Sequence, residues 1–146
     1  MNSYLSQQVQ SIAEKKDYVT LSEDILVGEA AKVMRGKDVS SVLVTSKNSN
    51  EPIGIVTEKD ILYHVVAENK GPFKVTLKNV MSSPLIAVIE KESVKDAIQL
   101  MRSKHIRRLA IKNTEGNITG VITLMSIVGN IPSDNLDPAG IELHLM

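Results

Sequence analysis

The chain has 146 residues, of which 42% are hydrophobic, and its 17 basic and 17 acidic side chains give a formal net charge of zero. This content suffices for one ordinary domain or for two very small ones that share a core. The absence of cysteine excludes disulfides, thiolate metal sites and cysteine nucleophiles. Neutral charge and only 3% aromatic residues argue against a dedicated nucleic-acid binder.

The N-terminal residues 1–16 are predicted to be an extension outside the folded repeats. They are polar and contain no apolar signal-peptide core. No apolar run in the chain approaches the roughly 20 residues that a membrane span needs. We therefore expect a cytoplasmic protein without membrane association. Leu5, Val9 and Ile12 are spaced for a docking helix face, but a frayed arm is an equal alternative.

The first copy of the fold is predicted for residues 17–70, beginning with a short strand near 18–21. Its first helix has apolar residues at i, i+3, i+4 and i+7, namely Val27, Ala30, Ala31 and Met34. Gly36 suits the end of that helix. Two strands, 39–44 and 53–56, flank a polar loop. A second helix follows, with an apolar face of Ile61, Leu62, Val65 and Val66.

A linker, 71–80, leads to the second copy, which is predicted for residues 81–132. Its leading strand is expected at 85–89, and its first helix repeats the same apolar spacing in Val94, Ala97, Ile98 and Met101. Strands at 106–111 and 118–122 precede a second helix that Pro132 ends. Residues 133–146 form a C-terminal tail.

The two copies match each other at a fixed offset. Val27, Ala30, Met34, Arg35 and Lys37 recur 67 residues later as Val94, Ala97, Met101, Arg102 and Lys104. After a loop one residue shorter, Gly54, Thr57 and Ile61 recur as Gly120, Thr123 and Ile127. The predicted fold class is therefore α/β (α+β), with two pseudo-symmetric β-α-β-β-α units. A unit of about 55 residues has only a marginal core, so we expect the two to pack through their sheets.

The motif GIVTEKDIL (54–62), and its second occurrence GVITLMSIV (120–128), resemble the signature of the cystathionine-β-synthase (CBS) domain. The tandem pair resembles a Bateman module over residues 17–132. The second copy departs from the pattern, because Ser126 stands where the family has an aspartate. The resemblance implies a non-catalytic module that binds an adenosine nucleotide in a cleft between two CBS units and regulates an effector protein.

Thr57 and Asp60 have two interpretations. Thr57 at the N-cap and Asp60 at the third helical position form the pattern of a capping box, which needs no ligand. Alternatively, the Asp60 carboxylate accepts hydrogen bonds from both ribose hydroxyls, with Thr57 and the helix N-terminus toward the phosphate. The resemblance favours the second interpretation.

Arg107 and Arg108 stand within an otherwise apolar strand, so alternation directs one to each face. A guanidinium facing a cleft suits a phosphate. The resemblance implies that one of them, left open here, serves the site near Asp60, and that adenine lies against Leu85 and Ile86. This predicts one strong nucleotide site, with phosphate number undetermined.

A second site is expected to be weak or empty, because its residues lack both carboxylate and arginine. Its members are Val19, Thr20, Ser40, Ser41, Thr123 and Ser126. His64, His105 and His144 are isolated, so no metal site and no catalytic cofactor are predicted. No catalytic set is recognisable either. We expect a homodimer through helix faces that include Ile61, Leu62 and Val128. The alternative hypothesis is a CBS-fold scaffold without a ligand.

Overall fold

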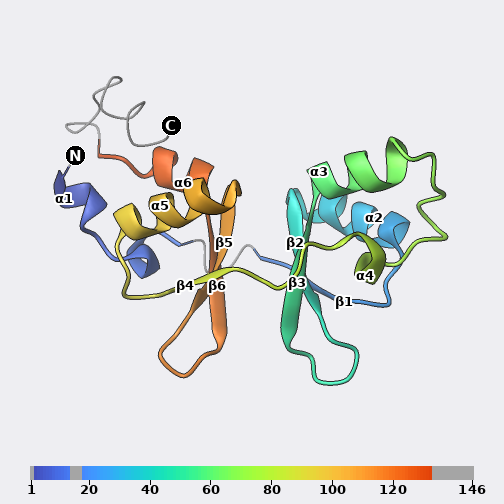
Figure 1. Cartoon of the computed structure of the whole chain (residues 1–146), viewed down its shortest axis with the longest axis horizontal. Helices are drawn as coiled ribbons and strands as arrows, with labels where there is room; N and C mark the ends of the chain where they lie inside the picture. The colour runs from blue at the N-terminus through green and yellow to red at the C-terminus, as the bar shows by residue number, and fades with distance from the viewer. Residues whose placement is uncertain (1, 14–17, 133–146) are drawn as a thin grey trace. The chain divides into compact units, whose positions relative to one another are not determined.

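The computed structural model describes residues 2–13 and 18–132, which form two compact units, each with a three-stranded sheet (Figure 1). The first unit comprises residues 18–86. The second unit comprises residues 87–132 together with the N-terminal residues 2–13. The predicted tail 133–146, with His144, lies outside the described residues, as does the end of the predicted extension.

The first unit has the predicted β-α-β-β-α order. Its elements are β1 (Thr20–Ser22), α2 (Val27–Lys37), β2 (Ser41–Thr45), β3 (Pro52–Thr57), α3 (Glu58–Ile61), the π-helix η2 (Leu62–Val66) and α4 (Leu77–Val80). The sheet order is β1-β2-β3, with β1 parallel and β3 antiparallel to β2. The predicted hairpin of two central strands is therefore confirmed.

The second unit repeats this arrangement. Its elements are α1 (Asn2–Leu5), the 3-10 helix η1 (Val9–Ser11), β4 (Ala87–Ile89), α5 (Val94–Lys104), β5 (Arg108–Lys112), β6 (Ile118–Thr123) and α6 (Leu124–Gly129). The sheet order is β4-β5-β6, again with one parallel and one antiparallel pair. The leading strand, predicted from residue 85, begins at Ala87, so Leu85 and Ile86 precede it.

The first helix of each unit ends at a residue in the left-handed conformation. Asp38 (φ 53°) follows α2, and His105 (φ 56°) follows α5. The prediction that Gly36 ends α2 was wrong, because the helix continues through Lys37. Aspartate and histidine are among the non-glycine residues that enter this region most readily, so they replace the expected glycine.

The core of the first unit lies where α2 covers the sheet. Val27, Ala30 and Met34 from α2 pack with Val42, Val44 and Val56 from the strands and with Val65, Leu77 and Val80. The predicted helix face is confirmed except for Ala31, which is exposed. In α5 all four predicted residues, Val94, Ala97, Ile98 and Met101, are buried. No helix within residues 2–13 and 18–132 is long and apolar enough to cross a membrane.

Each unit is joined by the segment that precedes the other copy in the sequence, and the two segments make matching contacts. Residues 75–77 contact the first unit, and residues 7–9 contact the second. In the first unit the Leu77 N–H donates to the Ile25 carbonyl (2.9 Å) and the Val27 N–H to the Val75 carbonyl (2.8 Å). In the second unit the Val9 N–H donates to Glu92 (2.8 Å) and the Val94 N–H to Gln7 (2.8 Å). Leu5, Val9 and Ile12 are buried. The N-terminal segment is therefore docked rather than frayed.

Candidate functional site

Thr57 and Asp60 form a capping box at the junction of β3 and α3. The Asp60 N–H donates to Thr57 Oγ1 (3.2 Å), and the Thr57 N–H donates to Asp60 Oδ2 (2.9 Å). The Thr57 hydroxyl also donates to Oδ2 (3.2 Å). The capping interpretation is thus confirmed. It engages one carboxylate oxygen, Oδ2, and the ribose interpretation now concerns the other, Oδ1.

Ser82 is the neighbour of that second oxygen and was not among the predicted site residues. Its hydroxyl donates to Asp60 Oδ1 over 3.5 Å, a long and weak contact. Ser82 is held in place by two backbone hydrogen bonds with Ile55, of 3.0 and 2.9 Å. The chain passes so close to Gly54 that a Cβ there would lie 2.8 Å from the Ser82 carbonyl oxygen. The motif glycine therefore makes room for the Ser82 segment.

The second unit has a capping box at the equivalent place, built with serine instead of aspartate. The Ser126 N–H donates to Thr123 Oγ1 (2.9 Å), and the Thr123 N–H donates to Ser126 Oγ (2.9 Å). The Ser126 hydroxyl donates to the Thr123 carbonyl (2.8 Å), and the side chain is buried. The Ser126 hydroxyl therefore both accepts from and donates to the backbone of Thr123.

A third capping box begins α5, where Ser93 is the N-cap and Asp96 the third helical residue. The Ser93 N–H lies 3.4 Å from Asp96 Oδ2, and the Asp96 N–H lies 3.1 Å from Ser93 Oγ. Like the box of α3, this box has an aspartate as its third helical residue, but it lies outside the predicted site. Asp96 thus offers a matched control for Asp60.

Arg107 and Arg108 both belong to the second unit. Arg107 is exposed and precedes β5, where its carbonyl accepts the Leu124 N–H (2.9 Å). Arg108 is half-buried in β5, opposite Thr123, and alternation puts it on the face of Ala110 rather than that of Leu109. The predicted one-to-each-face arrangement is consistent with this register.

The first unit holds most of the other predicted residues. Ser41 lies opposite Thr57 in the sheet, as Arg108 lies opposite Thr123. The Ser40 carbonyl accepts the Glu58 N–H (3.0 Å), while Thr20 begins β1 and Val19 directly precedes it. Leu85 and Ile86 are half-buried at the end of the unit. The structure thus brings Thr57, Asp60 and Ser41 to one end of a hairpin, and the part of the arginines stays a prediction.

A hydrogen bond from Lys70 lowers the pKa of Glu68, and the two form an exposed ion pair of 2.9 Å. Within residues 2–13 and 18–132 no group of three or more His, Asp or Glu side chains could hold a metal ion.

Comparison with known proteins decides the family. The model of the CBS domain matches residues 9–67 and 77–133, so the matches begin at Val9 and Leu77, which make corresponding hydrogen bonds. The chain belongs to the CBS domain family. The two matches confirm a tandem pair of CBS domains, and the mixed α/β fold with two three-stranded sheets agrees with this.

Three similar proteins illustrate the range of the family. An uncharacterized protein of Methanopyrus kandleri is 37% identical over 114 residues, covering 78% of this chain and 58% of the relative. Inosine-5'-monophosphate dehydrogenase of Methanocaldococcus jannaschii is 32% identical over 113 residues, covering 77% of this chain and 21% of the enzyme. A CBS domain protein from Pyrobaculum aerophilum, complexed with AMP, superposes with a TM-score of 0.75 at 24% identity, covering 94% of this chain and 97% of that chain. The chain thus spans less than two thirds of the length of both curated relatives.

Proposed function

We propose that this CBS pair is a non-catalytic regulatory module that binds an adenosine nucleotide of the AMP, ADP or ATP type and signals its occupancy to an effector protein. The observation that carries the proposal is the geometry of Asp60. The capping box engages Oδ2, whereas Oδ1, among the residues that the structure describes, has the long contact with Ser82. An ionised carboxylate oxygen at the start of α3 can accept hydrogen bonds from ribose hydroxyls.

The second unit supports this argument by showing what the cap requires. Ser126 completes the Thr123 box with a single hydroxyl. A helix at this place in the unit can therefore be capped without a carboxylate, and the second oxygen of Asp60 is available for another role. The AMP complex of the Pyrobaculum aerophilum protein makes an adenosine ligand the first candidate for that role.

In this proposal the remaining parts of the ligand contact the other predicted residues. Leu85 and Ile86 contact adenine, and Arg107 or Arg108 contacts phosphate. The weak second site would use Val19, Thr20, Ser40, Ser41, Thr123 and Ser126. Because the Ser126 hydroxyl already accepts the Thr123 N–H and donates to the Thr123 carbonyl, Ser126 offers no ribose acceptor like that of Asp60. We expect one strong site per chain.

The test is thermal unfolding with AMP, ADP, ATP and S-adenosylmethionine. A ligand that binds only the folded state stabilises it by about 2.7 kcal/mol at a concentration one hundred times its Kd. We expect at least one adenosine nucleotide to raise the Tm. A Tm unchanged by all four compounds at millimolar concentration would favour a ligand-free scaffold, a function that the complete capping box of Thr57 and Asp60 also permits.

A ligand series separates ribose from phosphate contacts. Replacing the phosphate-binding arginine with alanine should weaken AMP, ADP and ATP strongly and adenosine hardly at all, since a hydrogen bond to a charged group is worth about 1.5–3 kcal/mol. The other arginine should tolerate the change. Calorimetric titration of Arg107→Ala and Arg108→Ala measures this. Intact binding in both variants would exclude the arginines from the site.

We also propose that the module is a homodimer. Leu62, Tyr63 and Val66 are 54%, 54% and 63% exposed on one short helical segment. Of the residues predicted for this interface, Leu62 is exposed, whereas Ile61 and Val128 are half-buried. Light scattering at micromolar concentration should give twice the chain mass, and Leu62→Lys should reduce it. A monomeric mass for the wild type would contradict the proposal.

A further inference from the structure

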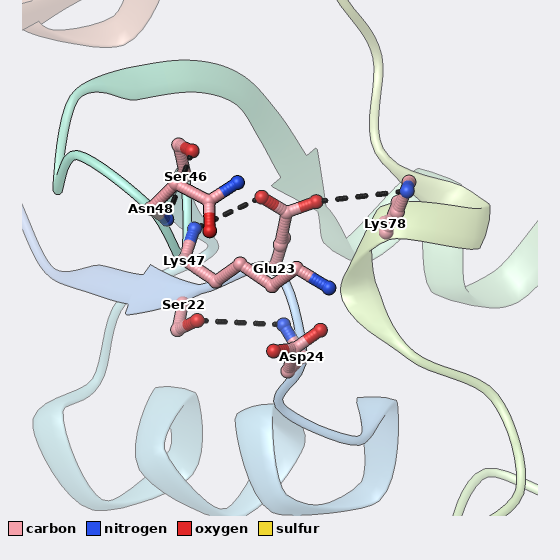
Figure 2. Close-up of polar contacts among 7 residues, drawn as sticks. All are labelled: Ser22, Glu23, Asp24, Ser46, Lys47, Asn48 and Lys78. Atoms are coloured by element: carbon pink, nitrogen blue, oxygen red, sulfur yellow. Dashed lines mark hydrogen bonds and ion pairs between the residues drawn. The ribbon is translucent and has the colours of Figure 1, made fainter.

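Glu23 is a buried carboxylate that the proposed ligand site does not use. It follows β1, and the residue is 7% exposed. Figure 2 shows its two oxygens turned in different directions. Oε2 accepts the Lys47 N–H (2.9 Å) from the hairpin loop, and Oε1 lies 3.9 Å from Lys78 Nζ on α4. One side chain therefore links the hairpin loop to α4.

The backbone of Glu23 reinforces the same link. Its N–H donates to the Thr45 carbonyl (2.9 Å), and its carbonyl accepts the Lys78 N–H (3.1 Å). Because burying a charge is costly unless it is hydrogen-bonded or paired, a carboxylate kept here must have its partners in place. One partner, Lys47, lies in the hairpin loop, and the other, Lys78, lies on α4. Glu23 thus contacts α4 through both its side chain and its backbone.

The position of α4 sets the position of Ser82. The helix ends at Val80, which is buried with Leu77, and Ser82 is two residues further on. Ser82 has its hydroxyl on Asp60 Oδ1 and its backbone paired with Ile55. A continuous set of contacts therefore leads from Glu23 through α4 and Ser82 to the oxygen that the proposed function assigns to ribose.

Within its described residues, the second unit lacks the charged part of this arrangement. Glu90 repeats the backbone pattern, since its N–H donates to Lys112 (2.8 Å) and its carbonyl accepts the Gln10 N–H (3.1 Å). Gln10 takes the place of Lys78 and carries no charge to pair with a carboxylate. Glu90 is also less buried than Glu23. The ion pair with α4 is thus a feature of the unit that has Asp60.

We propose that Glu23 is a positioning residue for the ligand site, which acts through α4 and Ser82 to orient Asp60. The proposal rests on the proposed function of Asp60 in ribose binding. In this proposal Glu23 affects only the contact between Asp60 and the ribose of the ligand. Adenosine and AMP should therefore respond equally to its removal, unlike their response to loss of a phosphate contact.

The experiment is calorimetric titration of adenosine and AMP into the full chain. Glu23→Ala should weaken both ligands by a similar factor, about two- to tenfold, the range that one neutral hydrogen bond is worth. Ser82→Ala should do the same, and the double variant should bind no more weakly than Ser82→Ala alone, because both act on one contact. Glu23→Gln keeps an acceptor for the Lys47 N–H but loses the charge facing Lys78, so its effect should be smaller. Glu90→Ala is the matched control and should bind as the wild type does.

The outcomes separate this proposal from the function it rests on. A wild-type chain that binds neither ligand would overturn both. Wild-type binding with unchanged affinity in Glu23→Ala, whatever its Tm, would overturn the positioning role alone. Losses that add in the double variant would also overturn it, because they would show that Glu23 does not act through Ser82. If Glu23→Ala does not fold, Glu23→Gln and its double variant with Ser82→Ala are measured instead.

Discussion

The second helices of the two units begin alike and then differ. Each starts with a threonine N-cap and a complete capping box, Thr57 with Asp60 in one unit and Thr123 with Ser126 in the other. In the second unit the third helical residue is buried, whereas Asp60 is half-buried and keeps an oxygen, Oδ1, outside the box. The same local structure is thus achieved with and without a carboxylate. The comparison separates what the fold needs from what the aspartate adds.

The two helices differ further along the chain as well. In the first unit α3 passes directly into the π-helix η2, where the Ala67 N–H reaches back to the Leu62 carbonyl (2.9 Å). Short π-helices are rare and occur often at functional sites. In the second unit α6 is α-helical, and the Tyr4 hydroxyl donates a hydrogen bond to the Ile127 carbonyl. The π-helix thus exposes Leu62, Tyr63 and Val66, whereas α6 exposes Met125 and is hydrogen-bonded to Tyr4 of the N-terminal segment.

The prediction with the largest expected effect tests whether the N-terminal segment is part of the folded core of the second unit, as α4 is of the first. Val9 is fully buried, so Val9→Asp would place an unpaired charge in the core and cost about 3–5 kcal/mol of unfolding free energy. Urea denaturation measures the loss. Hydrogen exchange should show it first in β4, β5 and β6. Ser11→Asp, exposed two residues away, is the control, and equal stability of the two variants would contradict the docked segment.

The next effect tests the difference between the two boxes directly. Asp60→Ser gives α3 the box of α6, so the cap should persist while the ribose acceptor is lost. We expect affinity for adenosine ligands to fall by about 1.5–3 kcal/mol, or roughly 10- to 150-fold. Stability should change by less than about 1 kcal/mol, the typical cost of losing a cap entirely.

Asp96→Ser is the matched control for that experiment, because it changes the same residue type at the same position of a capping box. It should alter stability as little as Asp60→Ser does and leave nucleotide affinity unchanged. If both variants retain wild-type affinity, the ribose role of Asp60 is wrong. Asp60 then has only its capping role, and the scaffold hypothesis becomes the better account.

Periodicity and internal repetition predicted the element order and the first-helix faces, because buried residues on a regular helix must recur every three or four positions. The Thr57–Asp60 box was also predictable, since capping depends on residues three apart. Where α3 gives way to η2, regular periodicity fails. Leu62 and Val66, predicted to share an apolar face with Val65, are exposed, whereas Val65 is buried.

A contact between distant residues explains why the place of Ser82 was not predicted. Ser82 is 22 residues from Asp60, and the two meet only because the chain returns to pair with Ile55. The one sequence signal was Gly54, whose missing side chain permits this close approach. Ser126 was expected to mark a weak or empty site. Its box, a local contact, was missed because Glu or Gln is the usual residue at that position.

The prediction with the smallest expected effect concerns the Tyr4 hydroxyl, which hydrogen-bonds to α6. Tyr4→Phe keeps the ring but leaves the Ile127 carbonyl without this donor, so stability should fall by about 1 kcal/mol.

Burial raises the pKa of Tyr4 from 10.0 to about 12. Because the folded state holds the phenolic proton more tightly than the unfolded state, this contribution is fully present below pH 10 and is lost as the pH rises toward 12. The stability difference between wild type and Tyr4→Phe should therefore be constant near neutrality and shrink above pH 10. Tyr63→Phe, at an exposed tyrosine of the first unit, is the control, and a Tyr4→Phe difference that persists at pH 12 would show that the hydroxyl does not fasten α6.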